Sequence, residues 1–317
     1  MGLRLGLLST ANINGAILHG AAQTDAVDVV AVASRSDQRA RAYAREHGLE
    51  RAHGSYEALL ADDEVDAVYV STPNALHVDN AIAALRAGKH VLCEKPMSWH
   101  EAEVERAFDE ADAGGRVLME AFMYRHHPQM RRLGELAREA IGEVRLIRAC
   151  FSFPLMATEN VRWRRELQGG ALMDVGSYCV SGARFVAGGE PVRVAAERVE
   201  GGDGVDARLT GLLRFDGDVL AVIDCGFDLP PRSGLEVHGS DGSLLLADPW
   251  HGRAPGIEIR RGDDVERVAT EAADPYRCEL DNFAAAVAGE APPLLGRDDA
   301  VGQARAIELL YAAAGRT

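Results

Sequence analysis

The sequence lacks the features that mark membrane and nucleic-acid-binding proteins. No stretch of its 317 residues approaches the roughly 18 consecutive apolar residues of a membrane span. Basic residues are outnumbered, because 34 Lys and Arg stand against 49 Asp and Glu and give a net charge of −15. This balance argues against a nucleic acid or an anionic membrane as partner and is typical of a soluble protein.

Paired cysteines and metal-ligand spacings are also missing. The five cysteines lie in apolar stretches without a CxxC pattern, so we expect reduced, buried thiols. The adjacent side chains of His126 and His127 diverge and no third ligand has suitable spacing, so we predict no metal site. The apolar run at residues 3–8 is too short for a signal peptide. These observations predict a cytoplasmic enzyme.

The length favours two domains. The first third alternates β-branched apolar runs with amphipathic helices, which is typical of βαβ units around a parallel sheet. Ser36 can cap a helix that ends at Gly48, and Asn74 can cap another that ends at Gly88. The predicted strands are Leu3 to Leu8, Val27 to Ala33, Ala67 to Val70, Val91 to Cys93 and Val117 to Met119.

From about Arg145 the pattern changes to strands punctuated by Gly and Asp, which indicates a second, largely antiparallel sheet. Helical periodicity returns at residues 274–287 and 298–314. We therefore predict an α/β domain at 1–122, followed by an α+β domain at 123–317 whose terminal helices pack back on the first. The predicted strands of the second domain are Arg208 to Phe215, Val219 to Phe227, Leu235 to His238 and Ser243 to Leu246.

The turn after the first strand lacks the glycines of a Rossmann fingerprint. Small residues stand at two of their positions, Ser9 and Ala11, and still allow close approach to a pyrophosphate. Free amides at the start of the following helix supply an anion site whatever the side chains are. The residues predicted to bind the cofactor in this turn are Ser9, Thr10, Ala11, Asn12 and Ile13.

No acidic residue for a ribose 2′-hydroxyl follows the second strand. Instead Ser34, Arg35 and Arg39 offer donors suited to a 2′-phosphate, so NADP is favoured over NAD. The alternative is a solvated helix start with stray arginines.

Two further strand ends carry polar residues. The segment Ser71, Thr72, Pro73, Asn74 with His77 could line the nicotinamide-ribose side of the crevice, although His77 alone would be an ordinary surface helix residue. In Glu94-Lys95-Pro96 the proline disfavours a helical conformation for Lys95, so we expect Lys95 to be extended at the carboxyl end of its strand, where open α/β sheets bind ligands.

Asp174 and Tyr178 are four residues apart, which on a helix places both side chains on one face. A carboxylate there can orient a phenol. The alternative is a helix-capping Asp174 and a core Tyr178 with a satisfied hydroxyl.

These motifs, together with 120–125 and 170–176, resemble the glucose-fructose oxidoreductase/inositol dehydrogenase (Gfo/Idh/MocA) family over essentially the whole chain. Within it the sequence looks most like NADP-dependent D-xylose dehydrogenases and dimeric dihydrodiol dehydrogenases. The resemblance implies a Rossmann domain followed by an open, mainly antiparallel sheet, and a homodimer or homotetramer formed through that sheet.

The resemblance also implies that Lys95, Asp174 and Tyr178 meet over the nicotinamide. Lys95 would bind the reacting hydroxyl and favour the ionised phenol, Tyr178 would be the general acid and base, and Asp174 would orient substrate or phenol. Tyr124 and Tyr276 would join Tyr178 on the substrate. Glu94, Arg162 and Trp163 would contact the cofactor, the last two from a loop that could otherwise be exposed and basic.

The expected activity is hydride transfer between nicotinamide and a sugar or polyol hydroxyl, or the corresponding carbonyl. Two alternatives stay open: reduction of a keto-sugar attached to a nucleotide or of another carbonyl, and a catalytically silent NADP-sensing regulator. Fold analogy does not choose among substrates.

Overall fold

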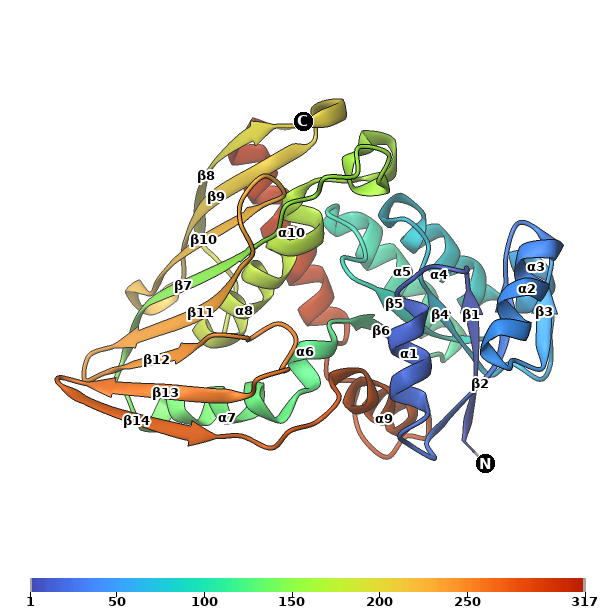
Figure 1. Cartoon of the computed structure of the whole chain (residues 1–317), viewed down its shortest axis with the longest axis horizontal. Coiled ribbons are helices and arrows are strands. Elements are labelled where there is room, and N and C mark those ends of the chain that lie inside the picture. The colour runs from blue at the N-terminus through green and yellow to red at the C-terminus, as the bar shows by residue number, and fades with distance from the viewer. Residues whose placement is uncertain (1, 316–317) are drawn as a thin grey trace. The chain divides into compact units, whose positions relative to one another are not determined.

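A computed structural model describes residues 2–315 as two compact units (Figure 1). The first unit comprises residues 1–126 and 274–301, and the second comprises 127–273 and 302–317. The first unit therefore includes a segment near the carboxyl terminus. The predicted boundary at residue 122 stays a prediction.

The first unit is built on a six-stranded parallel sheet of order β3-β2-β1-β4-β5-β6. The residues of β4 and the middle of β5 are buried, as expected for strands covered on both faces. Its strands are β1 (Leu3–Leu8), β2 (Val27–Ala33), β3 (Arg51–His53), β4 (Ala67–Val70), β5 (His90–Glu94) and β6 (Leu118–Ala121). The predicted parallel sheet is thus confirmed, with β3 as a strand that the sequence pattern missed.

Capping residues were predicted at the ends of two helices of the first unit. The Ser36 hydroxyl accepts the Arg39 N–H and Gly48 adopts the left-handed conformation, so the predicted helix from Ser36 to Gly48 is confirmed. The predicted Asn74 cap is wrong, because a 3₁₀ turn at Asn74–Leu76 precedes α4. The helices are α1 (Asn14–Ala21), α2 (Asp37–His47), α3 (Tyr56–Leu60), α4 (His77–Arg86), α5 (Glu101–Gly114), α6 (Met123–His126) and α9 (Pro275–Val287).

The second unit is built on an eight-stranded sheet of order β14-β13-β12-β11-β7-β10-β9-β8. Among the described pairings of this sheet only that of β7 with β10 is parallel, so the predicted mainly antiparallel sheet is confirmed. Its strands are β7 (Val144–Ser152), β8 (Arg193–Glu200), β9 (Asp206–Arg214), β10 (Leu220–Gly226), β11 (Arg232–Gly239), β12 (Ser243–Leu246), β13 (Gly256–Arg261) and β14 (Asp264–Ala269).

Buried and exposed residues alternate along β9 and β10, so one face of this sheet carries the core. Helices α7 (Pro128–Glu139) and α8 (Ser177–Ala187) pack on that face, while the opposite face stays open (Figure 1). Helix α10 (Arg297–Ala313) begins in the first unit and ends in the second.

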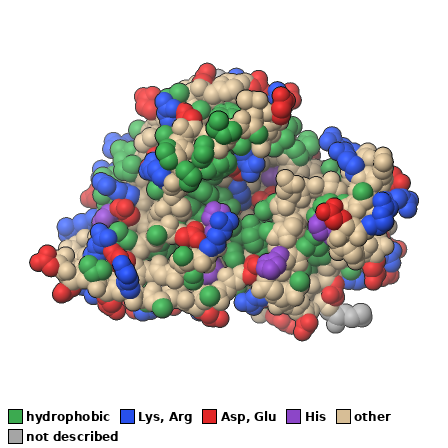
Figure 2. All heavy atoms as spheres, viewed as in Figure 1, with side chains coloured by type: hydrophobic (Ala, Val, Ile, Leu, Met, Phe, Trp, Pro, Cys, Tyr) green, Lys and Arg blue, Asp and Glu red, His purple; other side chains and the backbone are tan. Residues whose placement is uncertain are grey.

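Two surface properties follow from the composition. Basic and acidic side chains are interspersed over the face drawn in Figure 2. Between residues 2 and 315, no helix combines the length and the apolar character that crossing a bilayer requires.

Candidate functional site

The turn between β1 and α1 is fixed by a serine where a Rossmann fingerprint has glycine. Ser9 has a φ of 155°, which side chains rarely adopt. Its hydroxyl lies 2.9 Å from the main-chain oxygen of Ser71, to which it can donate, and accepts the Ala11 N–H at 3.1 Å. These bonds join the first nucleotide turn to the turn after β4 and hold Ser9 in its unusual conformation.

The same turn offers donors to an anion. Within the described chain, the N–H groups of Asn12 and Ile13 have no acceptor, and both residues directly precede α1. Amides at a helix start favour negative charge.

The arginines predicted to select NADP lie at the start of the next helix. Ser34 is buried just beyond the carboxyl end of β2, whereas Arg35 and Arg39 are exposed on either side of the capping Ser36. This is where Rossmann enzymes recognise the ribose 2′-position. Binding of a 2′-phosphate by these residues stays a prediction.

His77 connects two turns of the first unit. Its Nδ1 lies 2.9 Å from the Pro96 oxygen and its Nε2 lies 2.7 Å from the Thr72 oxygen. Burial is the main cause that lowers its pKa. The imidazole therefore holds the turn after β4 against the Glu94-Lys95-Pro96 turn, and a buried ring with both nitrogens so placed is suited to positioning more than to contact with a cofactor.

Glu94 anchors the turn that carries Lys95. Its carboxylate accepts the Tyr69 hydroxyl, and its second oxygen lies 3.1 Å from the Lys95 N–H. Burial, followed by the charge of Glu94, raises the pKa of Tyr69 well above its usual value. Tyr69 therefore stays a donor and fixes Glu94.

A second buried carboxyl, Glu279 on α9, belongs to this cluster. Its side chain is 1 % exposed, and within the part of the chain that the structure describes its Oε1 has no hydrogen-bond partner. Burial and then the charge of Glu94 raise the pKa of Glu279 well above its usual value. The cluster thus places two carboxyl groups close enough for each to affect the other. Sequence reasoning missed Tyr69 and Glu279 because ordinary core and helix patterns conceal them.

The second unit brings Asp174 together with a residue that the sequence assigned to the cofactor. Arg162 Nε donates to Asp174 Oδ2 at 2.5 Å, and their side chains are 41 % and 15 % exposed. The main-chain oxygen of Arg162 also accepts the Gly170 N–H at 2.9 Å. The loop before the π-turn and α8 therefore folds back onto Asp174.

The spacing of Asp174 and Tyr178 predicted a regular α-helix. In the structure Asp174 lies outside α8. Residues Leu172–Gly176 form a π-helical turn, and α8 begins directly after it. Such turns are rare in proteins, and those that occur often lie at functional sites. Asp174 lies on this π-turn and Tyr178 on α8, so the same-face argument for one ideal α-helix does not apply directly to the pair.

The Tyr178 ring is held by aromatic contacts. Phe151 meets it edge to face at a centroid distance of 5.6 Å, and Trp250 is tilted against it at 6.0 Å. These contacts bury most of the ring and fix the direction in which the hydroxyl points.

Three other aromatic residues predicted to contact cofactor or substrate have contacts within the protein. Trp163 lies edge to face with Phe227 at 5.3 Å in the second unit. Tyr124 is fully buried against Phe122 in the first. Tyr276 is the second residue of α9, and its N–H donates to the capping Asp274 carboxylate at 2.8 Å. Their contacts with cofactor or substrate stay predictions.

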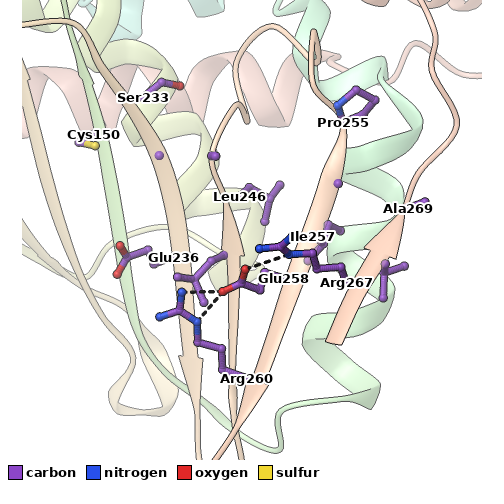
Figure 3. A pocket seen from close by; sticks show the side chains of 15 residues that line it. Cys150, Ser233, Glu236, Leu246, Pro255, Ile257, Glu258, Arg260, Arg267 and Ala269 are labelled. Carbon is purple, nitrogen blue, oxygen red and sulfur yellow. Dashed lines mark hydrogen bonds and ion pairs between the residues drawn. The ribbon is translucent and has the colours of Figure 1, made fainter. Parts of the chain in front are cut away.

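A pocket of about 660 Å³ lies on the eight-stranded sheet and contains none of the predicted site residues (Figure 3). The strand register aligns Glu236, Leu245, Glu258 and Arg267 in one row on its open face. Glu258 accepts Arg260 Nε at 2.6 Å and lies 3.5 Å from Arg267 Nε.

Residues 2–315 contain no cluster of three or more His, Cys, Asp or Glu arranged to hold a metal.

The predicted catalytic residues are divided between the units. Lys95 directly follows β5 in the first, and Asp174 and Tyr178 lie in the second. Their meeting over the nicotinamide stays the expectation drawn from the family. Within each unit, the structure shows how the local turn is held.

Comparison with known families matches both units. The model of an oxidoreductase family with an NAD-binding Rossmann fold matches residues 9–122. The model of the GFO/IDH/MocA C-terminal domain matches residues 129–245.

Named relatives span the chain. D-xylose 1-dehydrogenase (NADP(+)) 2 of Haloferax volcanii is 40% identical over 98% of this chain and 97% of its own. Trans-1,2-dihydrobenzene-1,2-diol dehydrogenase of Macaca fascicularis is 35% identical over 90% of this chain and 85% of its own.

A solved 3-ketoreductase from Actinomadura kijaniata, in complex with NADP and TDP-benzene, has a TM-score of 0.92 at 32% identity and covers 99% of this chain and 98% of its own. The predicted resemblance is confirmed by both family models and by relatives of both named types. The chain belongs to the Gfo/Idh/MocA family of oxidoreductases.

Proposed function

We propose that this protein is an NADP-dependent oxidoreductase that interconverts a sugar or polyol hydroxyl and the corresponding carbonyl, with aldoses such as D-xylose as its substrates. The observation that carries the proposal is the retention of Lys95 after β5 and of Asp174 and Tyr178 at the π-turn, in a chain 40% identical to a D-xylose dehydrogenase.

The residues of the nucleotide turn fit the cofactor. The N–H groups of Asn12 and Ile13 suit a pyrophosphate, and the exposed Arg35 and Arg39 suit a 2′-phosphate. Bound NADP would supply the hydride acceptor, and NADPH the donor, at the nicotinamide ring. Ser9 and Ser71 would keep the two adjoining turns in place.

The chain's own residues would manage the proton. Tyr178 would take the hydroxyl proton during oxidation and return it during reduction, while Lys95 would bind the same oxygen as a cation and favour the ionised phenol. Asp174, fixed by Arg162, would orient the substrate or the phenol. Glu94 would set the Lys95 main chain through the bonds already described.

The cofactor assignment is tested by titrating wild type and Arg35→Ala with NADPH and NADH and following nucleotide fluorescence. We expect wild type to prefer NADPH, and Arg35→Ala to lose roughly tenfold to a hundredfold in NADPH affinity with little change for NADH, because a charge-assisted bond to phosphate is worth about 1.5–3 kcal/mol. Arg45→Ala, at an exposed arginine of α2, is the matched control. An equal loss of affinity for NADPH and NADH in Arg35→Ala would contradict a 2′-phosphate site.

The substrate class is tested by a parallel screen. Aldoses and dihydrodiols are offered with NADP, and keto-sugars with NADPH. Oxidation of aldoses supports the first proposal. Reduction of nucleotide-linked 3-keto-sugars without aldose oxidation would favour the second candidate, which the match to the Actinomadura kijaniata 3-ketoreductase supports. Nucleotide binding without any turnover would favour a regulator.

We also propose association into a homodimer or homotetramer through the open face of the eight-stranded sheet, as the family resemblance implies. Ala195, Leu212 and Val222 form an apolar row there across β8, β9 and β10. The buried thiols of Cys93, Cys179 and Cys225 support a reducing compartment, and we propose the cytoplasm as the site of action.

A further inference from the structure

The π-turn that carries Asp174 is bonded at both ends to side chains of the second unit. At its start the fully buried Asp206 accepts the Leu172 N–H at 2.6 Å and the Tyr311 hydroxyl at 2.9 Å. A buried carboxylate is stable only when such donors satisfy it. Asp206 and Tyr311 therefore fix the first residue of the turn.

Ser177, the first residue of α8 directly after the turn, is also bonded to a side chain. Gln303 Nε2 donates to the Ser177 oxygen at 2.8 Å, one residue before Tyr178. Gln303 Oε1 in turn accepts Arg184 Nη1 at 3.0 Å, and Arg184 pairs with Glu190 through two nitrogens at 2.7 and 2.6 Å. The glutamine amide is thereby oriented, and its donor can only point toward the π-turn.

Close packing prevents the turn from relaxing. Gly170 has a φ of +127°, and a Cβ there would lie 2.2 Å from Asp206 Oδ1. A Cβ on Gly176 would lie 2.7 Å from Cys225 Sγ. The backbone therefore approaches Asp206 at one end and β10 at the other, closer than any other residue type permits.

Gln303 and Tyr311 both lie on α10 and are eight residues apart, which places them on the same side of a helix. One helix thus reaches both ends of a turn that is intrinsically less favourable than the α-helix that would replace it. If either bond were lost, the turn could shift toward α-helical geometry and redirect Asp174.

We propose that Tyr311, through Asp206, and Gln303, through Ser177, are positioning residues for catalysis, and that α10 sets the relative direction of Asp174 and Tyr178 by holding both ends of the π-turn. This inference rests on the proposed function for its kinetic consequence. Neither residue needs to touch the substrate or the cofactor.

The test uses the full chain with Tyr311→Phe, Gln303→Met and the double variant. Each single substitution keeps the side-chain volume and removes one bond to the turn or to its anchor. Leu309→Ala, on the same helix and 40 % exposed, is the matched control. Circular dichroism and thermal melts first show which variants fold. Gln303→Met keeps the inference testable if Tyr311→Phe does not fold.

Two readouts separate positioning from general stability. We expect kcat to fall roughly tenfold to a hundredfold in each single variant, the scale of a misplacement of about 1 Å, with KM and the NADPH Kd within about twofold of wild type. Amide hydrogen exchange in peptides covering 172–178 should become faster in these variants and remain unchanged in Leu309→Ala.

Folded variants with wild-type kcat and wild-type exchange would overturn the inference. If wild type turns over nothing in the screen, exchange still decides: faster exchange supports the restraint of the π-turn while the proposed function fails, and unchanged exchange overturns the restraint itself.

Discussion

At the scale of single residues, the pair of Arg162 and Asp174 changes how the site is understood. Arg162 is predicted to contact the cofactor, and in the structure its Nε also lies 2.5 Å from Asp174. A planar guanidinium fixes the direction of the carboxylate that it binds. Asp174 can then orient a neighbouring hydroxyl.

This interpretation predicts a separation of kinetic effects in Arg162→Met. Loss of the pair frees the Asp174 side chain, so we expect kcat to fall by roughly tenfold, as for other losses of orientation, while the NADPH Kd changes less than twofold. Arg162→Lys retains a cation but not the planar guanidinium, so its kcat should lie between those of wild type and Arg162→Met. Steady-state kinetics and nucleotide titration measure both. A large loss of NADPH affinity with unchanged kcat would instead support the cofactor contact.

At the scale of elements, α9 introduces a buried acid into the first unit. Glu279 is neutral in the folded protein over a pH range in which it is ionised in the unfolded chain, because burial and Glu94 raise its pKa from the ordinary value of 4.5. The folded state then binds more protons than the unfolded state. Its contribution to stability is therefore present below pH 4.5 and is lost as pH rises toward the folded pKa.

Glu279→Gln should remove this dependence. We expect wild type to lose stability relative to the variant as pH rises from 5 to 8, by at most about 1.4 kcal/mol per pH unit, the slope for one proton. Urea unfolding at several pH values, compared with the exposed control Glu290→Gln, gives the difference. A constant difference between wild type and Glu279→Gln across this range would show that Glu279 is ionised in the folded state.

Sequence patterns identified the elements whose structure is set locally. Ser36 and Gly48 mark the two ends of α2, and Ser243 to Leu246 coincides with β12. Strands β8 and β14 were missed because both lie at the edges of the sheet and are mostly exposed, with charged residues that do not favour strands. These segments become strands because their main chains pair with β9 and β13, respectively.

The candidate site also has a part that the sequence predicts and a part that it does not. Lys95 could be placed at a strand end because Pro96 restricts it and the preceding run is apolar. The π-turn could not be predicted, because its bonds come from Asp206 and Gln303, which are distant in sequence. Spacing alone indicates a regular helix, and tertiary contacts decide otherwise.

At the scale of the whole molecule, the open sheet face is where association is expected. Leu212 is 45 % exposed at the centre of the row formed with Ala195 and Val222. A charge buried in an association surface without a partner costs several kcal/mol. We therefore expect Leu212→Lys to convert the oligomer to a monomer, as measured by light scattering during size exclusion.

Leu309→Lys, an exposed leucine on a helix and not on this sheet, is the control and should leave the mass unchanged. If wild type already has the mass of one chain, or if Leu212→Lys leaves the oligomer intact, association through this row is wrong.

The central claim is that Tyr178 transfers the hydroxyl proton in an NADP-dependent oxidation. Tyr178→Phe keeps the ring that Phe151 and Trp250 hold and removes only the hydroxyl. The most direct measurement is kcat for the best aldose with NADP, in wild type and Tyr178→Phe, beside the NADPH Kd of each. We expect kcat to fall by about 10²–10⁴-fold with the Kd unchanged; a variant that turns over as fast as wild type would contradict the claim.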